Sequence, residues 1–176
     1  MSRAQNADIG AAGEERAAAH IDALELVDDS DEHRVDGHLV EPVVAEIGPV
    51  ETVVAAAGTP VEVKTVALRK AAQRGSTRRG ELHIRRENHA HLLVEDGEYA
   101  IVIYRGSRDD VGALAWVRVV LVSARTVDCH ITTWSRDRRY GHDIARMPWS
   151  RLLDEETTER EQSVDRGTET ADEVAV

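Results

Sequence analysis

The chain has few of the residues on which several classes of protein depend. It contains one cysteine, Cys129, in 176 residues, which excludes a disulfide framework and a multi-cysteine zinc site and favours a reducing compartment. No stretch approaches the roughly 20 apolar residues that a membrane helix needs, and residues 1–10 lack the apolar core of a secretory signal. We therefore expect a cytoplasmic protein with no membrane contact, large enough to bury one hydrophobic core.

Lysine is also scarce, and acidic residues outnumber basic ones. Of the 22 basic residues only Lys64 and Lys70 are lysine, and 33 acidic residues leave a net charge of −11. Taken as a whole, this charge has the wrong sign for a nucleic-acid-binding protein. The charge is uneven, however, because residues 69–86 hold seven basic residues and one acidic residue. Any binding of nucleic acid is therefore expected to be local to this segment.

Periodicity along the chain predicts a mixed α/β domain. An alanine-rich helix comes first, followed by short strands, a second helix, and a central strand that is apolar on both faces. In chain order, the expected elements are a helix over 10–26, strands and turns over 35–44 and 50–56, a strand over 59–66, a loop over 69–79, a strand over 80–85, a helix over 86–95, the central strand over 98–104, its partner over 114–122, and closing segments over 130–134 and 143–149.

The end of the sequence differs in composition from the rest. Residues 154–176 carry nine acidic residues, two arginines and almost no apolar residue. Such a segment buries too little surface to offset the entropy that ordering would cost. We expect a domain over residues 1–153 and a disordered acidic tail over residues 154–176.

The segment Val61-Glu62-Val63-Lys64 is the first candidate for chemistry. In a strand, the period of two places the valines on one face and Glu62 with Lys64 on the other. An isolated pair of this kind is most often solvated on an edge strand. In a chain that uses arginine almost everywhere, however, a lysine beside a glutamate indicates a need for a compact charge whose pKa can shift. Next to a metal ion, such an amine can help deprotonate water or stabilise negative charge on a phosphate.

The order of elements around this strand resembles the PD-(D/E)XK nuclease superfamily, whose shared core is a helix, three strands, a helix and a strand. The resemblance covers residues 10–104 and implies a restriction endonuclease-like α/β fold, a mixed β-sheet flanked by helices in a single domain. The chain is also similar to small archaeal members of this group over residues 79–84 and 146–150. The abundance of arginine and acidic residues, with no phenylalanine, resembles the proteins of salt-loving archaea, in whose concentrated salt distant acidic residues hardly repel DNA.

The resemblance implies a metal-dependent DNA endonuclease that hydrolyses phosphodiester bonds. Glu62 and Lys64 match the acidic residue and the lysine of the family's half-motif. Glu14 or Glu15 matches the glutamate of its first helix, where it would hold a water of the metal ion. With Mg²⁺ or Mn²⁺ bound near Glu62, Lys64 would lie beside the attacking water.

The upstream aspartate of the family is less clear, because this chain has no Pro-Asp pair. Asp36, which lies 26 residues before Glu62, is the best match, with Asp31 and Glu46 as alternatives. Two carboxylates, Asp36 and Glu62, and the main-chain carbonyl of Val63 would then supply the oxygen ligands that Mg²⁺ or Mn²⁺ prefers.

The basic segment supplies the expected contacts to DNA. Its glycine and serine would let the arginines fold over a phosphate backbone, and no aromatic residues are interleaved for base stacking. The alternative is a solvated loop whose charge pairs with the acidic body. Generic phosphate binding is predicted for Arg69, Lys70, Arg74, Arg78, Arg79, Arg85, Arg86 and His89.

Three functions remain open at this stage. The first is an endonuclease of restriction-like, junction-processing or repair type, the second a nuclease-fold DNA-binding or interaction module without catalysis, and the third an acidic adaptor that uses its tail. A histidine-and-asparagine nuclease site around Asn88 and a zinc site at Cys129 are weaker, because residues i and i+2 of a helix point apart and one cysteine is too few. Small members of the family often dimerise, so a homodimer is compatible with the resemblance.

Overall fold

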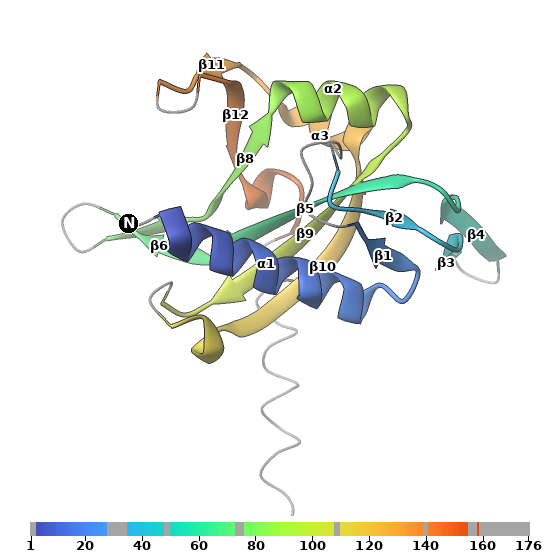
Figure 1. The fold of residues 1–176 in the computed structure, drawn as a ribbon, viewed down its shortest axis with the longest axis horizontal. Coiled ribbons are helices and arrows are strands. Elements are labelled where there is room, and N and C mark those ends of the chain that lie inside the picture. Colours follow the sequence, from blue (N-terminus) through green and yellow to red (C-terminus); the bar gives the residue numbers. More distant parts are fainter. Residues whose placement is uncertain are drawn as a thin grey trace, which may run out of the picture.

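The computed structural model describes residues 3–27, 35–47, 50–72, 76–107, 110–138, 141–154 and 158. A central mixed sheet of five strands carries the fold, in the order β1-β2-β5-β9-β10 (Figure 1). The predicted acidic tail over 154–176 falls almost wholly outside the described residues. The strands of this sheet are β1 (Leu24–Leu26), β2 (Gly37–Leu39), β5 (Pro60–Ala67), β9 (Glu98–Arg105) and β10 (Ala115–Ser123).

Only one pair of neighbouring strands in this sheet is parallel. β5 runs parallel to β9, with Val61 opposite Glu98 and Lys64 opposite Ile101, while β1–β2, β2–β5 and β9–β10 are antiparallel. Seven of the eight residues of β9 are buried, which confirms the prediction of a strand covered on both faces. β9 is an interior strand between β5 and β10, and the middle strand of the five is β5. The parallel pair at the centre needs a crossover, and the chain between β5 and β9 supplies it through the helix α2 (Arg86–Val94).

Helices cover both faces of the sheet. Helix α1 (Arg3–His20) packs on one face, where Ala17 joins a cluster with Val61 and Val63. Its approach to β5 is so close that a Cβ atom on Gly13 would lie 1.7 Å from the Oγ1 of Thr65. On the other face, α2 and α3 (Ala124–His130) enclose a larger cluster that includes Val66 of β5, Leu82 and Ile84 of β8, and Tyr99 and Ile101 of β9. The predicted architecture, a mixed sheet flanked by helices, is confirmed.

The first helix differs from its predicted bounds. It begins at Arg3 and ends at His20, whereas residues 24–26 form strand β1 instead of a last helical turn. Leu24 is buried opposite Leu39 of β2, and both leucines belong to the cluster beneath α1. Pairing with β2 therefore buries leucines that a longer helix would have carried away from the sheet. When only the strands of the central sheet and their helices are counted, the order up to β9 is α1-β1-β2-β5-α2-β9, which is the predicted helix, three strands, helix and strand.

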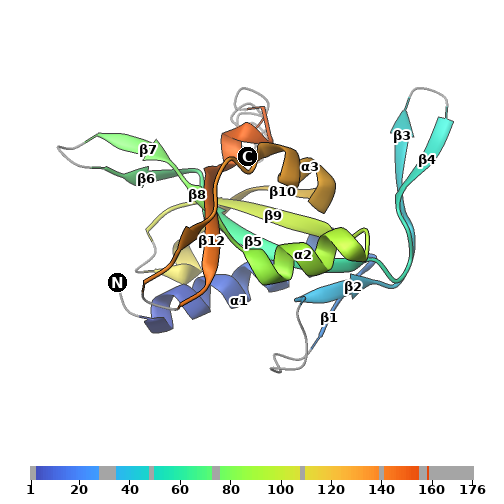
Figure 2. The same ribbon diagram turned by 90° about the horizontal axis from the view of Figure 1, so that it is seen from above.

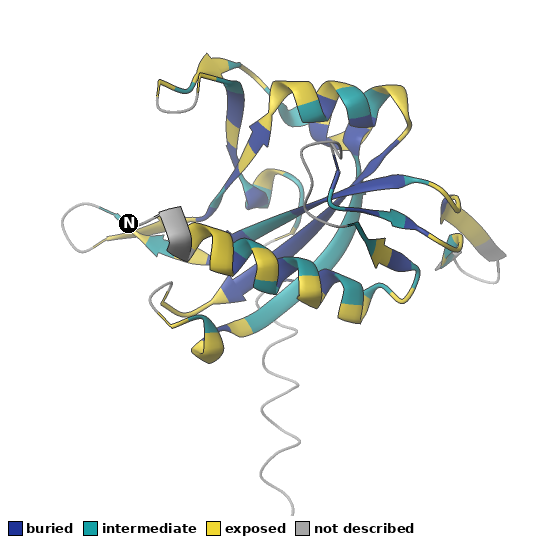
Figure 3. Ribbon diagram, viewed as in Figure 1, coloured by how far each residue is buried: buried dark blue, intermediate teal, exposed yellow. Residues whose placement is uncertain are grey.

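A second, smaller sheet packs beside the first. Strand β12 (Asp143–Pro148) lies between β8 (Glu81–Arg85) and β11 (Ser135–Arg136), and both pairings are antiparallel. A 3₁₀ turn, η3 (Trp149–Arg151), follows β12 and carries the fully buried Trp149. A similar turn, η2 (Val111–Ala113), lies between β9 and β10. Figure 3 shows that buried positions are concentrated in the central strands and that β8 and β12 carry both buried and exposed positions.

Two antiparallel ribbons project from this body (Figure 2). One consists of β3 (Val43–Ile47) and β4 (Val50–Ala55), and the other of β6 (Arg69–Ala71) and β7 (Thr77–Arg79). The prediction of a loop over 69–79 is therefore wrong for its two ends, where Arg69 pairs with Arg79 and Lys70 with Arg78. Strand pairing satisfies the backbone hydrogen bonds there, which the side-chain composition of the segment did not reveal. No helix among the described residues is long and apolar enough to cross a membrane.

Candidate functional site

The alternation predicted for β5 is confirmed, but both of its faces are covered. Val61 and Val63 point to the α1 side and belong to the cluster there. Glu62 and Lys64 point to the side of α2. Glu62 is 2% exposed, so its carboxylate is a buried group and not part of a solvated edge pair. Burying a carboxylate is costly unless partners compensate for it.

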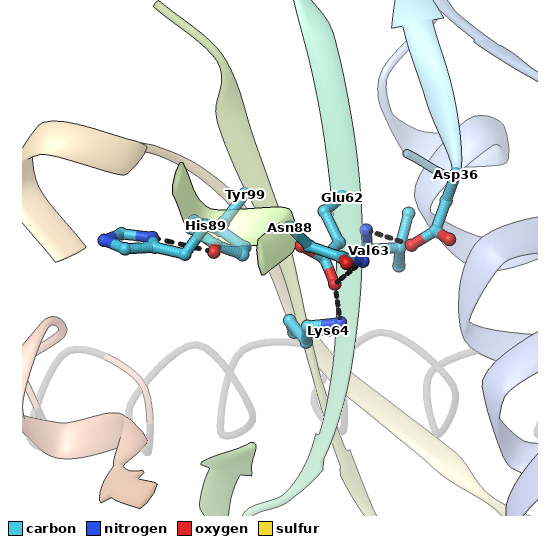
Figure 4. Close-up of polar contacts among 7 residues, drawn as sticks. All are labelled: Asp36, Glu62, Val63, Lys64, Asn88, His89 and Tyr99. Atoms are coloured by element: carbon cyan, nitrogen blue, oxygen red, sulfur yellow. Dashed lines mark hydrogen bonds and ion pairs between the residues drawn. The ribbon is translucent and has the colours of Figure 1, made fainter. Parts of the chain in front are cut away.

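The two oxygens of the Glu62 carboxylate differ in their surroundings (Figure 4). Oε1 accepts a hydrogen bond from the Nζ of Lys64 and a second one, at 3.3 Å, from the Nδ2 of Asn88 on α2. Oε2 is buried and has no hydrogen-bond partner among the described residues. Because buried polar atoms are nearly always paired, an orphaned carboxylate oxygen indicates a further partner, such as a water or an ion.

Asp36 lies at the edge of β5 where β2 stops pairing with it. β2 pairs with β5 only at Pro60 and Val61, and the N–H of Asp36 continues the pattern by donating to the carbonyl of Val61 at 3.0 Å. The Oδ2 of Asp36 then accepts the N–H of Val63 at 2.7 Å. In a strand, the N–H and C=O of one residue point to the same edge, so the carbonyl of Val63 also points toward the side of Asp36. The structure thus brings Asp36, which lies 27 residues before Val63 in the sequence, to the strand that carries Glu62.

Asp36, Glu62 and the carbonyl of Val63 are oxygen donors on or beside β5. Two carboxylates and one main-chain carbonyl fit Mg²⁺ or Mn²⁺, which prefer oxygen ligands and retain several waters. Among the described residues, no group of three or more His, Cys, Asp or Glu side chains could hold a metal ion. A cation here would therefore depend on the carbonyl of Val63 and on water to complete its ligands. The orphaned Oε2 of Glu62 is the observation that fits such an ion.

The other predicted acidic residues whose positions are described lie on elements other than β5. Glu14 is half-buried and Glu15 exposed on α1, which packs against the face of β5 opposite to Glu62 and Lys64. Glu46 lies on β3, in a ribbon outside the central sheet. Asp31 is outside the described residues. Among the described side chains of these candidates, that of Asp36 contacts the strand of Glu62.

His89 was predicted as a DNA contact, and the structure corrects this. It is 2% exposed, with Nδ1 at 2.9 Å from the hydroxyl of Tyr99 and Nε2 at 3.2 Å from the Oδ1 of Asp128. Both ring nitrogens are engaged inside the protein, so neither is available to a phosphate. Burial, and then the charge of Glu62, raises the pKa of Tyr99, which keeps its hydroxyl protonated beside His89.

Sequence reasoning missed two residues at this site, Asn88 and Tyr99. Asn88 stood out only as a neighbour of two histidines, and Tyr99 only as part of an apolar strand. The spacing of residues along α2 shows that positions 88 and 89 point in different directions, but it cannot show which of them meets Glu62.

The predicted phosphate-binding residues lie in two places. Four are on the β6–β7 ribbon, where Lys70 and Arg78 also contact Glu81 at 2.7 and 3.3 Å. The hydrogen bond from Lys70 lowers the pKa of Glu81 and keeps it ionised. Arg85 and Arg86 lie where β8 meets α2, and the guanidinium of Arg86 lies 5.9 Å from the ring centre of Trp134. Arg74 is outside the described residues. The ribbon residues are Arg69, Lys70, Arg78 and Arg79.

A second buried carboxyl group, Glu98, makes stability depend on pH. Burial raises the pKa of Glu98 from 4.5 to about 7, and among the described residues no side chain forms a hydrogen bond or ion pair with it. Between pH 4.5 and pH 7, Glu98 is mainly protonated in the folded chain and mainly ionised in the unfolded chain. The free energy of unfolding therefore falls as pH rises through this range. For Glu98 alone this loss is about 2 kcal/mol between pH 5 and pH 7, and it levels off above pH 7.

We expect Glu98→Gln to remove this part of the pH dependence. Urea unfolding of both proteins at pH 5, 6, 7 and 8, at constant salt, measures it. The variant should become more stable relative to the wild-type chain as pH rises to 7. Parallel curves for the two proteins would show that Glu98 is ionised in the folded state at pH 5.

Comparison with known proteins yields one match. The family model of the PD-(D/E)XK nuclease superfamily domain matches residues 1–154, which is most of the chain and includes every described element of both sheets. No curated protein and no solved structure matches the chain.

Proposed function

Because the chain belongs to the PD-(D/E)XK nuclease superfamily, we propose that it is a metal-dependent DNA endonuclease that hydrolyses phosphodiester bonds. The observation that carries the proposal is the buried Glu62 carboxylate, with Lys64 on one oxygen and no partner on the other. A protein that used this fold only for binding would gain nothing from a buried, half-satisfied carboxylate, which costs stability.

In this proposal the chain holds Mg²⁺ or Mn²⁺ through Asp36, Glu62 and the carbonyl of Val63. When bound, such an ion polarises the scissile phosphate and lowers the pKa of an attacking water. The protein's own contribution is to hold both carboxylates in position through hydrogen bonds. The Val63 amide does this for Asp36 at 2.7 Å, and Lys64 does it for Glu62.

Lys64 has a second role in the proposal. Its side chain is 21% exposed, so the ammonium group contacts Glu62 and can also reach a phosphate that approaches from solvent. A lysine in this position helps to remove a proton from water or stabilises negative charge as it develops on the phosphate. A role for Glu14 requires its carboxyl group to reach from α1 to the edge of β5 where Asp36 lies. The rate of DNA cleavage by Glu14→Gln tests this role.

The substrate is proposed to be DNA because basic residues gather on one ribbon and at the junction of β8 and α2. Phosphate contacts need no rigid orientation toward bases, so a projecting two-stranded ribbon is suited to them. The chain as a whole is acidic, but in concentrated salt distant charges are screened within a few ångströms, about 3 Å at 1 M. Contact between the ribbon and a phosphate backbone therefore depends mainly on the local charge.

Incubation of the full chain with plasmid, linear and branched DNA tests the proposal. The assay is run in high salt with Mg²⁺, with Mn²⁺, and with EDTA, and the products are separated on gels. Cleavage in the presence of either metal ion and its loss in EDTA are expected. Binding of DNA without cleavage under all conditions would favour a nuclease-fold binding module, and the absence of both would contradict a DNA substrate.

We expect the double variant Arg78→Ala/Arg79→Ala to bind DNA more weakly, and to a similar extent for unrelated sequences. If each arginine contacts one phosphate, the slope of log K against log salt becomes shallower by about 1.8, because each lost contact removes about 0.9. Fluorescence anisotropy with two unrelated duplexes over several salt concentrations measures this slope.

A matched control removes the same charge elsewhere. Arg125 forms an exposed ion pair with Asp96, and Arg151 is exposed and donates to a backbone carbonyl. Arg125→Ala/Arg151→Ala should leave the salt slope unchanged. An unchanged slope in Arg78→Ala/Arg79→Ala, or a loss confined to one DNA sequence, would contradict generic phosphate binding by the ribbon.

A further inference from the structure

Two successive residues of α2 meet two neighbouring residues of the central sheet (Figure 4). Glu62 of β5 and Tyr99 of β9 are opposite each other in the parallel register. Asn88 donates to the Oε1 of Glu62 at 3.3 Å, and the Nδ1 of His89 lies 2.9 Å from the hydroxyl of Tyr99. The first half of α2 is therefore attached to β5 and β9 beside the Glu62 carboxylate.

His89 holds this part of α2 in one orientation. Its ring is buried, stacks on Tyr99 with 5.9 Å between ring centres, and lies 5.8 Å from the ring centre of Trp134. Its Nε2 reaches Asp128 of α3 at 3.2 Å. Successive residues of an α-helix are separated by about 100° of rotation, so fixing His89 also fixes the direction of Asn88. The amide of Asn88 is thus held against Glu62 by the packing of the whole helix.

Asn88 adds to the difference in hydrogen bonding between the two carboxylate oxygens of Glu62. With Lys64 and Asn88 both donating to Oε1, the plane of the carboxylate is fixed and Oε2 is left without a partner. With Lys64 alone, the carboxylate could rotate and offer either oxygen to the ammonium group. The amide is also neutral, so it orients the carboxylate without repelling a nearby cation, whereas a second lysine in its place would compete with that cation.

We propose that Asn88 is a positioning residue for the metal ion: it holds Oε1 of Glu62 so that Oε2 is presented to a divalent cation. The inference rests on the proposed function, because it takes Glu62 as a metal ligand. Asn88 itself touches neither the metal ion nor DNA in this assignment. Residues that orient a metal ligand in this way typically change metal affinity or activity 10- to 100-fold when they are replaced.

Binding of Mn²⁺ to the full chain, in the absence of DNA, tests the proposal. Titration calorimetry and the electron paramagnetic resonance signal of free Mn²⁺ both report the affinity without any measurement of cleavage. Asn88→Ala is expected to bind Mn²⁺ about 10- to 100-fold more weakly. Asn88→Gln retains the amide on a longer side chain and should recover part of the loss. Glu87→Ala, at an exposed neighbouring position on α2, should bind as the wild-type chain does.

A second variant, Asn88→Leu, keeps the branched shape of the side chain and removes its hydrogen bonding. Thermal unfolding of each variant shows which of them are folded. Wild-type Mn²⁺ affinity in a folded Asn88→Ala or Asn88→Leu protein would overturn the role of Asn88 and leave the proposed function standing. If the wild-type chain binds no Mn²⁺, or if Glu62→Gln binds it equally well, the metal site itself fails and the role of Asn88 fails with it.

Discussion

Replacing Glu62 by glutamine, or Lys64 by methionine, is expected to lower metal-dependent DNA cleavage by at least about 100-fold, the lower end of what a group acting on a proton or on developing charge contributes. Glu62→Gln removes the charge that a cation would meet at the buried Oε2. Lys64→Met keeps the length of the side chain and removes the ammonium group that contacts Oε1. Initial rates of plasmid cleavage with Mg²⁺ and with Mn²⁺ measure both effects.

The two variants should differ in stability although both lose activity. Glu62→Gln leaves a neutral amide with Asn88 still in reach and Lys64 21% exposed to solvent. Lys64→Met leaves the Glu62 carboxylate, 2% exposed, without its charged partner. Breaking a fully buried ion pair costs about 3–5 kcal/mol, and the partial exposure of Lys64 makes the expected cost smaller. Urea unfolding should therefore rank Lys64→Met as the less stable protein.

A control for the loss of an ion pair is Arg125→Met, which breaks the exposed contact with Asp96. Its cleavage rate and its stability should both stay close to those of the wild-type chain, since exposed pairs contribute little. Cleavage at the wild-type rate by folded Glu62→Gln or Lys64→Met protein would remove the catalytic role of that residue and would favour a fold used for binding alone.

The largest loss of stability is expected for Trp149→Ala, at about 3–5 kcal/mol. Trp149 is fully buried, and its indole Nε1–H donates to the carbonyl of Leu68 at 3.0 Å. Its own N–H donates to the carbonyl of Gly80 at 3.3 Å. Leu68 directly follows β5, and Gly80 directly precedes β8, so this one residue joins the central sheet to the smaller sheet through its side chain and its backbone. Its removal leaves a large cavity at that junction.

Trp149→Phe separates the packing contribution from the hydrogen bond. It retains an aromatic ring but leaves the carbonyl of Leu68 without its donor, so a smaller loss, of about 1–3 kcal/mol, is expected. Trp116→Ala is the comparison at a half-buried site, where the tryptophan meets Tyr104 edge to face. Equilibrium unfolding in urea measures all three. An equal loss in Trp116→Ala and Trp149→Ala would show that Trp149 does not join the two sheets in the way described.

Several features of this protein follow from local sequence. The alternation of valine with charge over residues 61–64 determines the two faces of β5, because successive side chains of a strand point in opposite directions. The apolar run over residues 98–104 determines that β9 is an interior strand covered on both faces, since only such a strand is apolar at consecutive positions. The order of helix and strands around these two segments was sufficient to predict the family.

Other features needed the tertiary structure. Residues 24–26 became a strand because Leu24 is buried against Leu39, a contact that helix propensity does not contain. The segments 69–71 and 77–79, which carry four basic residues, form a two-stranded ribbon because they pair with each other. In both segments a partner distant in the chain, or across a turn, decided between conformations that the local sequence allowed.

The candidate metal site also combines features that follow from local sequence with features that only the tertiary structure decided. Local sequence determined that Glu62 and Lys64 share a face of β5. Tertiary structure alone decided that this face is buried under α2, that the carboxyl group of Asp36 meets the amide of Val63, and that one oxygen of Glu62 is left without a partner. The physical reason is that burial and hydrogen bonding depend on which elements pack together. These contacts join residues 26 or 27 positions apart, beyond the reach of any periodicity in the sequence.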